Sequence, residues 1–429
     1  MIITNSSVNS VAAIRDGVEF YYFGLGCIAD YYGNSIAYLD ELDIEIILLC
    51  GGTKTLIEII DCVETRTNCN RDDILNKLNK LYKKGVLIFN DLCMNKDVIF
   101  HGIKGLYFPK EVVIELTNMC NYACPFCYKN TQKQGEFITD EMIANINHMI
   151  YNNVNHILIT GGEPTIHPNY LKYITIFSEY AKVHMISNGS LLYNHDPNIL
   201  RKLELIQFTI YGCNNEEYNR MTGVKDGFTR LCNSIEFAKK NGIDIILAVT
   251  LCDATIDHME SFVKIAVDFG IKTLRIGLAD IFGRGEYLFE GTSEYEKQRI
   301  KAYDMLLELK RKYRKKINFQ LPNINIDHVT NHTDIYKNVY RNSLCCGCGS
   351  EYLVISQTGE IRPCQMLPES WFSIKNENAF IEHIHGNFHV EQLQESVRKY
   401  YTDNDYETLK ISPCQALENF VNLEKENYV

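Results

Sequence analysis

The stretch ELTNMCNYACPFCYKN, residues 115–130, places three cysteines within eight positions. These are Cys120, Cys124 and Cys127, in the spacing CxxxCxxC. A loop of this kind can wrap three thiolates around one side of a metal centre. Structural zinc requires four ligands, usually as two CxxC-like pairs, and the next cysteine or histidine along the chain is His148. Three thiolates on a four-iron cluster leave one iron open to a small molecule, so the spacing favours an iron–sulfur cluster.

The composition describes a globular protein. Of the 429 residues 46% are hydrophobic and only nine are proline, which excludes a disordered chain. The net charge of −11 argues against nucleic acid as a partner, because a phosphate backbone requires a basic face. The longest aliphatic run, IEIILLC at 44–50, is too short to cross a bilayer. The first residues lack a basic segment followed by an apolar one, so we expect no secretory signal and a cytoplasmic location without a membrane partner.

Most of the sixteen cysteines are not expected in disulfides, because the cytoplasm keeps thiols reduced. A free cysteine often behaves as a small buried hydrophobe. Six cysteines outside the two cysteine groups are therefore predicted in the core: Cys27, Cys50, Cys62, Cys93, Cys232 and Cys252.

From about residue 110 the sequence alternates between apolar strand patterns and amphipathic helices. Six strands are predicted, at 111–116, 156–160, 183–189, 206–212, 244–250 and 272–278. Helical patterns lie between them, for example at 139–153 and 227–242. Repeated β-α units predict an α/β fold with a parallel sheet, here a partial (β/α)6 barrel. The active site of such a fold lies at the carboxyl ends of the strands.

Two further regions flank this barrel. Residues 1–105 carry short strands and three predicted helices, at 40–52, 53–64 and 70–85, followed by a strand at 86–90. Gly51 and Gly52 are predicted to end the first helix, and Thr53 to begin the second as its N-cap. This region is predicted to be an α+β, winged-helix-like domain. We expect domains at 1–105, 106–319 and 320–429, the last built around a second cysteine group.

Further motifs follow the predicted strands in order, and together with the cysteines they resemble the radical S-adenosylmethionine (radical SAM) enzymes. The signature of that family is CxxxCxφC with an aromatic residue at φ, where this chain has Phe126. TGGEP at 160–164 resembles the family's GGEP motif, SNG at 187–189 a polar turn near the cofactor, and FTIYG at 208–212 a segment that often carries a serine where Thr209 stands.

The resemblance implies a set of site residues. The three cysteines would hold a [4Fe-4S] cluster whose open iron binds S-adenosylmethionine. Glu163 would hold the methionyl ammonium, the hydroxyl of Thr209 would bond to the ribose or carboxylate, and Arg275 would pair with the carboxylate. The implied cofactor contacts are Phe126, Gly161, Gly162, Glu163, Pro164, Ser187, Asn188, Thr209 and Arg275. One electron from the cluster would cleave the cofactor, and the 5′-deoxyadenosyl radical would take a hydrogen atom from the substrate.

The stretch CCGCGSEYLVISQTGEIRPC at 345–364 resembles the start of the SPASM and twitch extensions of these enzymes. The full cysteine pattern of a SPASM domain is absent from the sequence, since only Cys414 follows. The resemblance implies one auxiliary iron–sulfur cluster on Cys346, Cys364 and Cys414, with Cys345 or Cys348 as the fourth ligand. The alternative is a degenerate extension without a cluster.

The N-terminal region resembles the leader-recognition domain of enzymes that mature ribosomal peptides. The combination implies a maturase that binds the leader and core of a precursor peptide and receives electrons from a donor such as flavodoxin or ferredoxin. TIYG at 209–212 with YNRMTG at 218–223 resembles the thioether-forming maturases of sactipeptides, so a cysteine thioether is the first expectation. C–C cross-linking and epimerisation remain alternatives, with Cys213 as a candidate hydrogen donor or an ordinary loop cysteine. A tetrapyrrole substrate, sulfatase activation and a structural metalloprotein also remain open.

Overall fold

The computed structural model describes residues 10–31, 34–90, 97–279, 282–288, 302, 305–320, 349, 351–365 and 370–386. The chain divides into two compact units. Unit 1 comprises Met1–Lys110, Asn152–Val154 and Ile381–Phe388, and unit 2 comprises Glu111–Tyr151, Asn155–Phe380 and His389–Val429. Within the described ranges, no helix is both long and apolar enough to cross a membrane.

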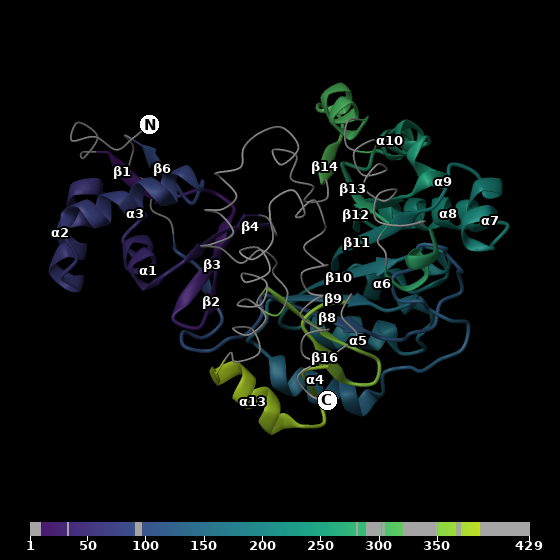
Figure 1. Cartoon of the computed structure of the whole chain (residues 1–429), viewed down its shortest axis with the longest axis horizontal. Helices are drawn as coiled ribbons and strands as arrows, with labels where there is room; N and C mark the ends of the chain where they lie inside the picture. The colour runs from purple at the N-terminus through teal and green to yellow at the C-terminus, as the bar shows by residue number, and fades with distance from the viewer. Residues whose placement is uncertain are drawn as a thin grey trace. The chain divides into compact units, whose positions relative to one another are not determined.

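Unit 1 is an α+β structure, whose described residues form helices and two small sheets (Figure 1). One sheet has the strand order β5-β1-β6 and the other β4-β3-β2-β7. The strands are β1 (Val11–Ile14), β2 (Val18–Phe23), β3 (Gly26–Tyr31), β4 (Asn34–Leu39), β5 (Gly51–Thr55), β6 (Leu87–Asn90) and β7 (Phe100–His101). The helices are α1 (Glu41–Leu48), α2 (Leu56–Thr67) and α3 (Arg71–Lys83).

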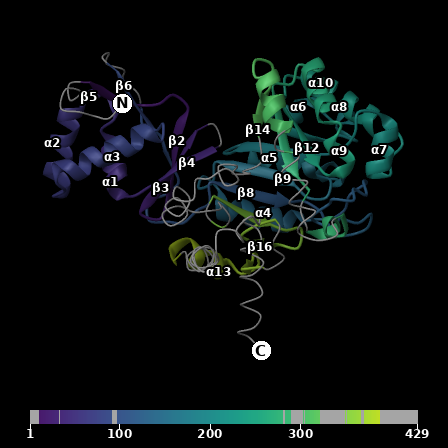
Figure 2. The ribbon, with the colours of Figure 1, turned by 45° about the horizontal axis from the view of Figure 1, so that its top comes forward.

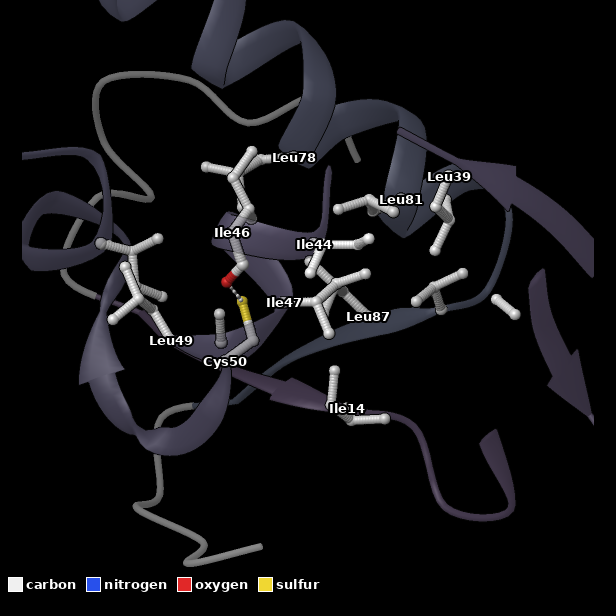
Figure 3. Packing of buried hydrophobic residues seen from close by; sticks show 14 of the residues in the cluster. Ile14, Leu39, Ile44, Ile46, Ile47, Leu49, Cys50, Leu78, Leu81 and Leu87 are labelled. Atoms are coloured by element: carbon white, nitrogen blue, oxygen red, sulfur yellow. Dashed lines mark hydrogen bonds between the residues drawn. The ribbon is translucent and has the colours of Figure 1, made fainter. Parts of the chain in front are cut away.

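The core of unit 1 is built from the apolar faces of these elements. Ile44 and Ile47 of α1, Leu81 of α3 and Leu87 of β6 are buried in one cluster (Figure 3). Cys50 joins this core, where its thiol donates a hydrogen bond to the carbonyl oxygen of Ile46 at 3.1 Å. Cys27 and Cys252, like Cys50, are buried as expected, whereas Cys62 and Cys232 are only partly buried. Cys93 lies outside the described residues.

The boundary between α1 and α2 differs from the prediction. Gly51 and Gly52 do not simply follow a helix: they open strand β5, which pairs with β1 in the register Ala13↔Gly51. The N-cap of α2 is Thr55, not Thr53, and its hydroxyl accepts a hydrogen bond from the backbone N–H of Glu58. Pairing with a strand some 40 residues away in the sequence therefore overrides the local helix signal.

Unit 2 is built on a parallel sheet. Its strands β8 (Glu111–Glu115), β9 (His156–Thr160), β10 (Lys182–Ser187), β11 (Leu203–Ile210), β12 (Asp244–Leu251) and β13 (Thr273–Leu278) are neighbours in chain order. All five pairings among these strands are parallel. The α/β class and the partial barrel of six parallel strands are thereby confirmed.

The helices of unit 2 connect these strands. Between β8 and β13 the helices are α4 (Asp140–Ile150), α5 (Tyr170–Phe177), α6 (Pro197–Leu200), α7 (Asn215–Thr222), α8 (Gly227–Lys240), α9 (Asp253–Ile256) and α10 (Met259–Asp268), with short 3₁₀ turns η1 (Pro164–Ile166) and η2 (Leu192–Asn194). A third 3₁₀ turn, η3 (Gly283–Leu288), follows β13. Helix α5 contacts β10, α8 contacts β11 and β12, and α10 contacts β13. Figures 1 and 2 show α7 to α10 along one side of the strands.

The sheet continues beyond the six strands at both edges. Strand β14 (Asn318–Gln320) pairs with β13, and β15 (Tyr352–Ile355) pairs in parallel with β8. The antiparallel strands β16 (Glu360–Arg362) and β17 (Phe372–Ser373) follow, and the last described helix is α13 (Glu377–Gly386). The predicted hairpin turn in SQTGEI is confirmed, since β15 and β16 form an antiparallel pair around Gly359.

Candidate functional site

The three cysteines of the 115–130 stretch lie in the loop that follows β8, at the carboxyl edge of the parallel sheet. All three are free thiols: Cys124 is buried, and Cys120 and Cys127 are partly buried. The backbone N–H of Cys120 donates to the carbonyl of Gln132 at 2.8 Å, and the thiol of Cys127 lies 3.5 Å from the hydroxyl of Thr131. Residues Thr131 and Gln132, which follow the loop in the sequence, thus hold it in place.

The glycine pair after β9 packs against the backbone of the cysteine loop. The N–H of Gly162 donates to the carbonyl of Thr117 at 2.7 Å, and the N–H of Glu163 donates to the carbonyl of Met119 at 2.9 Å. A Cβ atom on Gly162 would lie 2.0 Å from the Met119 carbonyl oxygen, and one on Gly161 would lie 2.5 Å from the Thr117 carbonyl oxygen. Only glycine fits at such a backbone approach. The pair therefore holds the loop that carries the thiols.

Glu163 is fully buried and ties the loop after β9 to the loop after β10. Its Oε1 accepts hydrogen bonds from the hydroxyl and N–H of Thr165, at 2.6 and 3.1 Å, and from the hydroxyl of Ser187 at 2.8 Å. Its Oε2 accepts from the N–H of Asn188 at 2.7 Å. Burial raises the pKa of Glu163, and these hydrogen bonds oppose the shift because they favour the charged form.

Asn188 joins this network to the first cysteine. Its Nδ2 donates to Asn121 Oδ1 at 2.8 Å and lies 3.9 Å from the Sγ of Cys120. Its Oδ1 accepts from the N–H of Ser190 at 2.9 Å, while Asn121 donates to the hydroxyl of Ser190 at 2.7 Å. The predicted residues of three strand ends, which are Cys120, Glu163 and Asn188, are therefore brought together in space.

Two aromatic side chains of the cysteine loop pack on Tyr211, which follows β11. Phe126 stacks on Tyr211, with ring centroids 5.9 Å apart, and Tyr211 also meets Tyr122 edge to face at 5.7 Å. The hydroxyl of Tyr122 is buried without a hydrogen-bond partner in the described structure. Thr209 lies two residues before Tyr211 on β11, paired with Ala248 of β12.

The surroundings of Cys120 and Cys124 keep these two thiols protonated in the absence of a metal. Burial raises the pKa of Cys120 to about 11, with the negative charge of Glu163 as the next cause. Burial also raises the pKa of Cys124, while a hydrogen bond from Tyr211 and the charge of Arg284 oppose that shift. Because a metal binds the thiolate, assembly of a cluster here releases protons. Three thiols on one loop, with hydrogen-bond donors beside them, fit the three protein ligands of a [4Fe-4S] cluster.

The described hydrogen bonds of Arg275 are to other strands and not to the cysteine loop. Its Nε donates to Gln320 Oε1 at 2.9 Å and its Nη1 to Gln207 Oε1 at 2.8 Å, so it bridges β11, β13 and β14. The protein around the guanidinium partly desolvates it, which lowers its pKa. Its predicted bond to the cofactor carboxylate stays a prediction.

One residue that the sequence did not point to is Arg284, in η3. Its Nε donates to the carbonyl of Cys124 at 2.8 Å and its Nη1 to the carbonyl of Thr131 at 2.6 Å. Its own N–H donates to the carbonyl of Cys127 at 3.0 Å. A single arginine after the last strand of the barrel carries no spacing signal, so only the fold reveals this contact.

The second cysteine group is described only at Cys364, at the end of the β15–β16 hairpin; Cys345, Cys346, Cys348 and Cys414 lie outside the described residues. Cys364 is buried, and the hydroxyl of Tyr352 lies 3.7 Å from its Sγ. The neighbouring Gln365 accepts a hydrogen bond of 2.6 Å from Tyr128, which follows Cys127 in the first group.

Cys213, the candidate hydrogen donor, lies after β11 in contact with Glu217 and Ser261. Its N–H donates to Glu217 Oε2 at 2.7 Å. Burial raises the pKa of its thiol to about 12, with the Glu217 carboxylate as the next cause. The thiol therefore stays protonated at neutral pH.

Residues 114–266 match the Radical SAM superfamily. This segment runs from β8 to α10 and contains the cysteine loop, the glycine pair, Glu163 and Asn188. Residues 114–266 are therefore a radical SAM domain, and the cofactors of this enzyme are a [4Fe-4S] cluster and S-adenosylmethionine.

Among known proteins the chain is similar to the antilisterial bacteriocin subtilosin biosynthesis protein AlbA of Bacillus subtilis, with 23% identity over 388 residues that cover 87% of this chain and 79% of AlbA. It is 26% identical to the sporulation killing factor maturation protein SkfB of the same organism over 43% of this chain and 46% of SkfB. The crystal structure of Streptococcus suis SuiB bound to precursor peptide SuiA matches with a TM-score of 0.59 at 14% identity, covering 88% of this chain and 90% of SuiB. At that identity the match shows a shared fold.

Proposed function

We propose that this enzyme matures a ribosomally made precursor peptide. The observation that carries the proposal is the extent of the similarity to AlbA, a bacteriocin biosynthesis protein, which covers 87% of this chain. That stretch reaches far beyond residues 114–266, so it includes more than the radical SAM domain. SkfB, a maturation protein for a killing factor, supports the same substrate class, as does the fold shared with the peptide-bound SuiB.

The reaction we favour is a thioether bond between a cysteine sulfur and a carbon atom of the peptide. Its formation is a two-electron oxidation: cleaved S-adenosylmethionine would accept the hydrogen atom from carbon, the thiol proton would go to solvent, and an iron–sulfur cluster would accept the remaining electron. C–C cross-linking and epimerisation are the alternatives within the same substrate class. Epimerisation requires a hydrogen donor, and the protonated thiol of Cys213 is the candidate that the sequence offered.

The parts of the site have separate roles in this proposal. Cys120, Cys124 and Cys127 hold the cluster, and the glycine pair with Glu163 and Asn188 fixes the loop that carries them. When bound, the cluster and S-adenosylmethionine supply the one-electron chemistry that removes a hydrogen atom from the substrate. The aromatic rings around the loop exclude water from this edge of the sheet.

The contacts to S-adenosylmethionine are proposed at the same strand ends. They involve the segment Gly161–Pro164, Ser187 with Asn188, and Thr209. Arg275, whose described hydrogen bonds are to Gln207 and Gln320, is also proposed as a contact. Glu163 Oε2 has one hydrogen-bond donor among the described residues, from Asn188, and an oxygen of a carboxylate can accept a second. The methionyl ammonium is the donor we assign to it.

An auxiliary iron–sulfur cluster on Cys346, Cys364 and Cys414, with Cys345 or Cys348 as the fourth ligand, is also part of the proposal. Two observations support this cluster. The thiol of Cys364 is buried, and the hydrogen bond from Tyr128 to the neighbouring Gln365 places Cys364 beside the first cysteine loop. Replacing Cys346, Cys364 and Cys414 by alanine should remove iron while the first cluster keeps its spectrum. Unchanged iron content would contradict the second site.

Unit 1 is the proposed binding site for the leader of the precursor. Strand β4 lies at the edge of its sheet, with β3 as its described partner. An extended peptide can add a strand to such an edge through main-chain hydrogen bonds, which tolerates varied leader sequences. A chain that begins at Lys110, kept folded and loaded with iron, should cleave S-adenosylmethionine but fail to modify a full precursor. Equal processing by this truncated chain would contradict the recognition role.

A cytoplasmic location and an electron donor such as flavodoxin or ferredoxin complete the proposal. Among the described residues, the ten cysteines from Cys27 to Cys252 form no disulfide, as expected in a reducing compartment.

The test of the substrate class is a search beside the gene for an open reading frame that encodes a precursor-like peptide, then co-expression with that peptide and mass spectrometry. A thioether or a C–C cross-link should appear as the loss of two hydrogens, and fragmentation should locate the linked residues. Epimerisation leaves the mass unchanged and requires chiral analysis. Cys120→Ala should abolish the change, and Cys69→Ala, which alters a cysteine of unit 1, should not. A peptide recovered without any change, beside an enzyme that cleaves S-adenosylmethionine, would favour a non-peptide substrate such as a tetrapyrrole.

A further inference from the structure

The turn η3 (Gly283–Leu288) is packed directly on the cysteine loop. Gly283 has a φ of +58°, and a Cβ atom there would lie 2.5 Å from the carbonyl oxygen of Cys127 and 2.3 Å from that of Tyr128. Any other residue would be strained in conformation and would clash with this backbone. Two independent requirements for glycine at one position show that the contact between the turn and the loop is close.

The next residue, Arg284, binds three carbonyl groups of the loop. They belong to Cys124, Cys127 and Thr131, at 2.8, 3.0 and 2.6 Å from the side-chain Nε, the backbone N and Nη1. A guanidinium offers its donors in a rigid planar fork, so it can hold several acceptors in a fixed arrangement. These carbonyls flank two of the three thiols.

The cysteine loop depends on contacts of this kind, because it is irregular backbone. In the described structure Cys127 N donates to Cys124 O at 3.3 Å and Asn130 N to Cys127 O at 3.1 Å, which are turn contacts rather than a regular ladder. Arg284 also brings a positive charge to the loop, and its Nη2 is buried without a hydrogen-bond partner in the described structure. A cluster on three thiolates is electron-rich, and both nearby charge and hydrogen bonds set its reduction potential.

We propose that Arg284 is a positioning residue for the cluster: it fixes the backbone of the loop that presents Cys124 and Cys127, and its positive charge stabilises the reduced cluster. The inference rests on the assignment of the cluster to the three cysteines, and it does not depend on which substrate is modified. Arg284 lies outside residues 114–266, the segment that matches the superfamily.

The test compares three variants of the full chain after anaerobic reconstitution. Arg284→Gln removes the charge and the fork, and Arg284→Lys keeps the charge but not the fork. Arg201→Gln is the matched control, because Arg201 also bonds to a backbone carbonyl, that of Asn241 at 3.3 Å, on the surface of the same unit. The measurements are the rate of iron release to a chelator and the midpoint potential of the cluster, with circular dichroism of each cluster-free protein to confirm folding.

Arg284→Gln should release iron at least about tenfold faster, since two charge-assisted hydrogen bonds to the loop are lost, and should shift the potential to more negative values. Arg284→Lys should release iron faster but keep a potential close to that of the wild type. Arg201→Gln should match the wild type in both. Wild-type iron release and potential in Arg284→Gln would overturn the inference. A chain with Cys120→Ala, Cys124→Ala and Cys127→Ala together separates the assignment of the cluster ligands from the role of Arg284. If this chain keeps all its iron, the ligand assignment is wrong. If it loses iron while Arg284→Gln behaves as the wild type, only the role of Arg284 is wrong.

Discussion

The close approach of the glycine pair to the cysteine loop predicts a large effect of Gly162→Ala. The new Cβ would lie 2.0 Å from the carbonyl oxygen and 2.5 Å from the carbonyl carbon of Met119, so one of two backbone segments has to move by more than an ångström. Overpacking of this kind costs about 1–3 kcal/mol. The bonds from Gly162 N to Thr117 and from Glu163 N to Met119 are both at risk, at about 1 kcal/mol each. We expect unit 2 to lose about 3–5 kcal/mol of unfolding free energy.

The assay is denaturant unfolding of the cluster-free protein, followed by iron content after reconstitution. Two glycine variants serve as controls. Gly277→Ala places its Cβ 3.9 Å from the carbonyl oxygen of Val249, an ordinary van der Waals contact, so the stability should change by about 0.5 kcal/mol or less. Gly242→Ala meets no atom within 4 Å but has a φ of +70°, so it should lose about 1 kcal/mol from strain alone. The reasoning is refuted if Gly162→Ala unfolds with the same free energy as Gly277→Ala and binds the same iron.

Three further changes test other parts of the structure. Glu163→Gln turns an amide donor toward groups that already donate, so it should cost about 1–3 kcal/mol of unfolding free energy, whereas the exposed Glu179→Gln should cost almost nothing; equal stability of the two would contradict the network. The thiol of Cys213, with its pKa raised to about 12, should react with iodoacetamide at pH 8.5 roughly 1000-fold more slowly than a free cysteine. The reaction rate should rise with pH until the thiolate is fully formed. Rapid labelling of Cys213, measured by peptide mapping, would disprove this. Ile47→Ala, in the core of unit 1, should cost about 2–5 kcal/mol there without loss of iron, and iron loss would show that the units are not independent.

The sequence was sufficient for the barrel because its strands are local signals. HILIT at 156–160 and DIILAVT at 244–250 are short β-branched runs, and both form strands within one residue of the prediction. Their order in the sheet follows from the β-α repeat, since consecutive parallel strands with helical crossovers become neighbours. The place of the cysteine loop and of the other motifs at the strand ends could also be predicted, because each motif is a short contiguous segment that directly follows a strand.

What the sequence missed depends on contacts between distant segments. The N-cap of α2 is Thr55 because the residues before it form β5 and pair with β1. No pattern of neighbouring residues predicts this pairing. The sequence indicates Gly161 and Gly162 only as cofactor contacts, and their close approach to the loop backbone at Thr117 and Met119 becomes visible only in the fold. Arg284 is separated from Cys124 by 160 positions, so its contact with the loop becomes visible only when the barrel brings η3 to the same edge.

The most direct test of the central claim is the formation of 5′-deoxyadenosine by the anaerobically reconstituted enzyme and by its Cys120→Ala, Cys124→Ala, Cys127→Ala variant, with a strong reductant and S-adenosylmethionine. We expect the wild type to form 5′-deoxyadenosine, and the variant to lack about four irons and to form none, while circular dichroism shows an unchanged cluster-free fold. Continued reductive cleavage of S-adenosylmethionine by the variant would contradict the assignment of the cluster to the loop after β8.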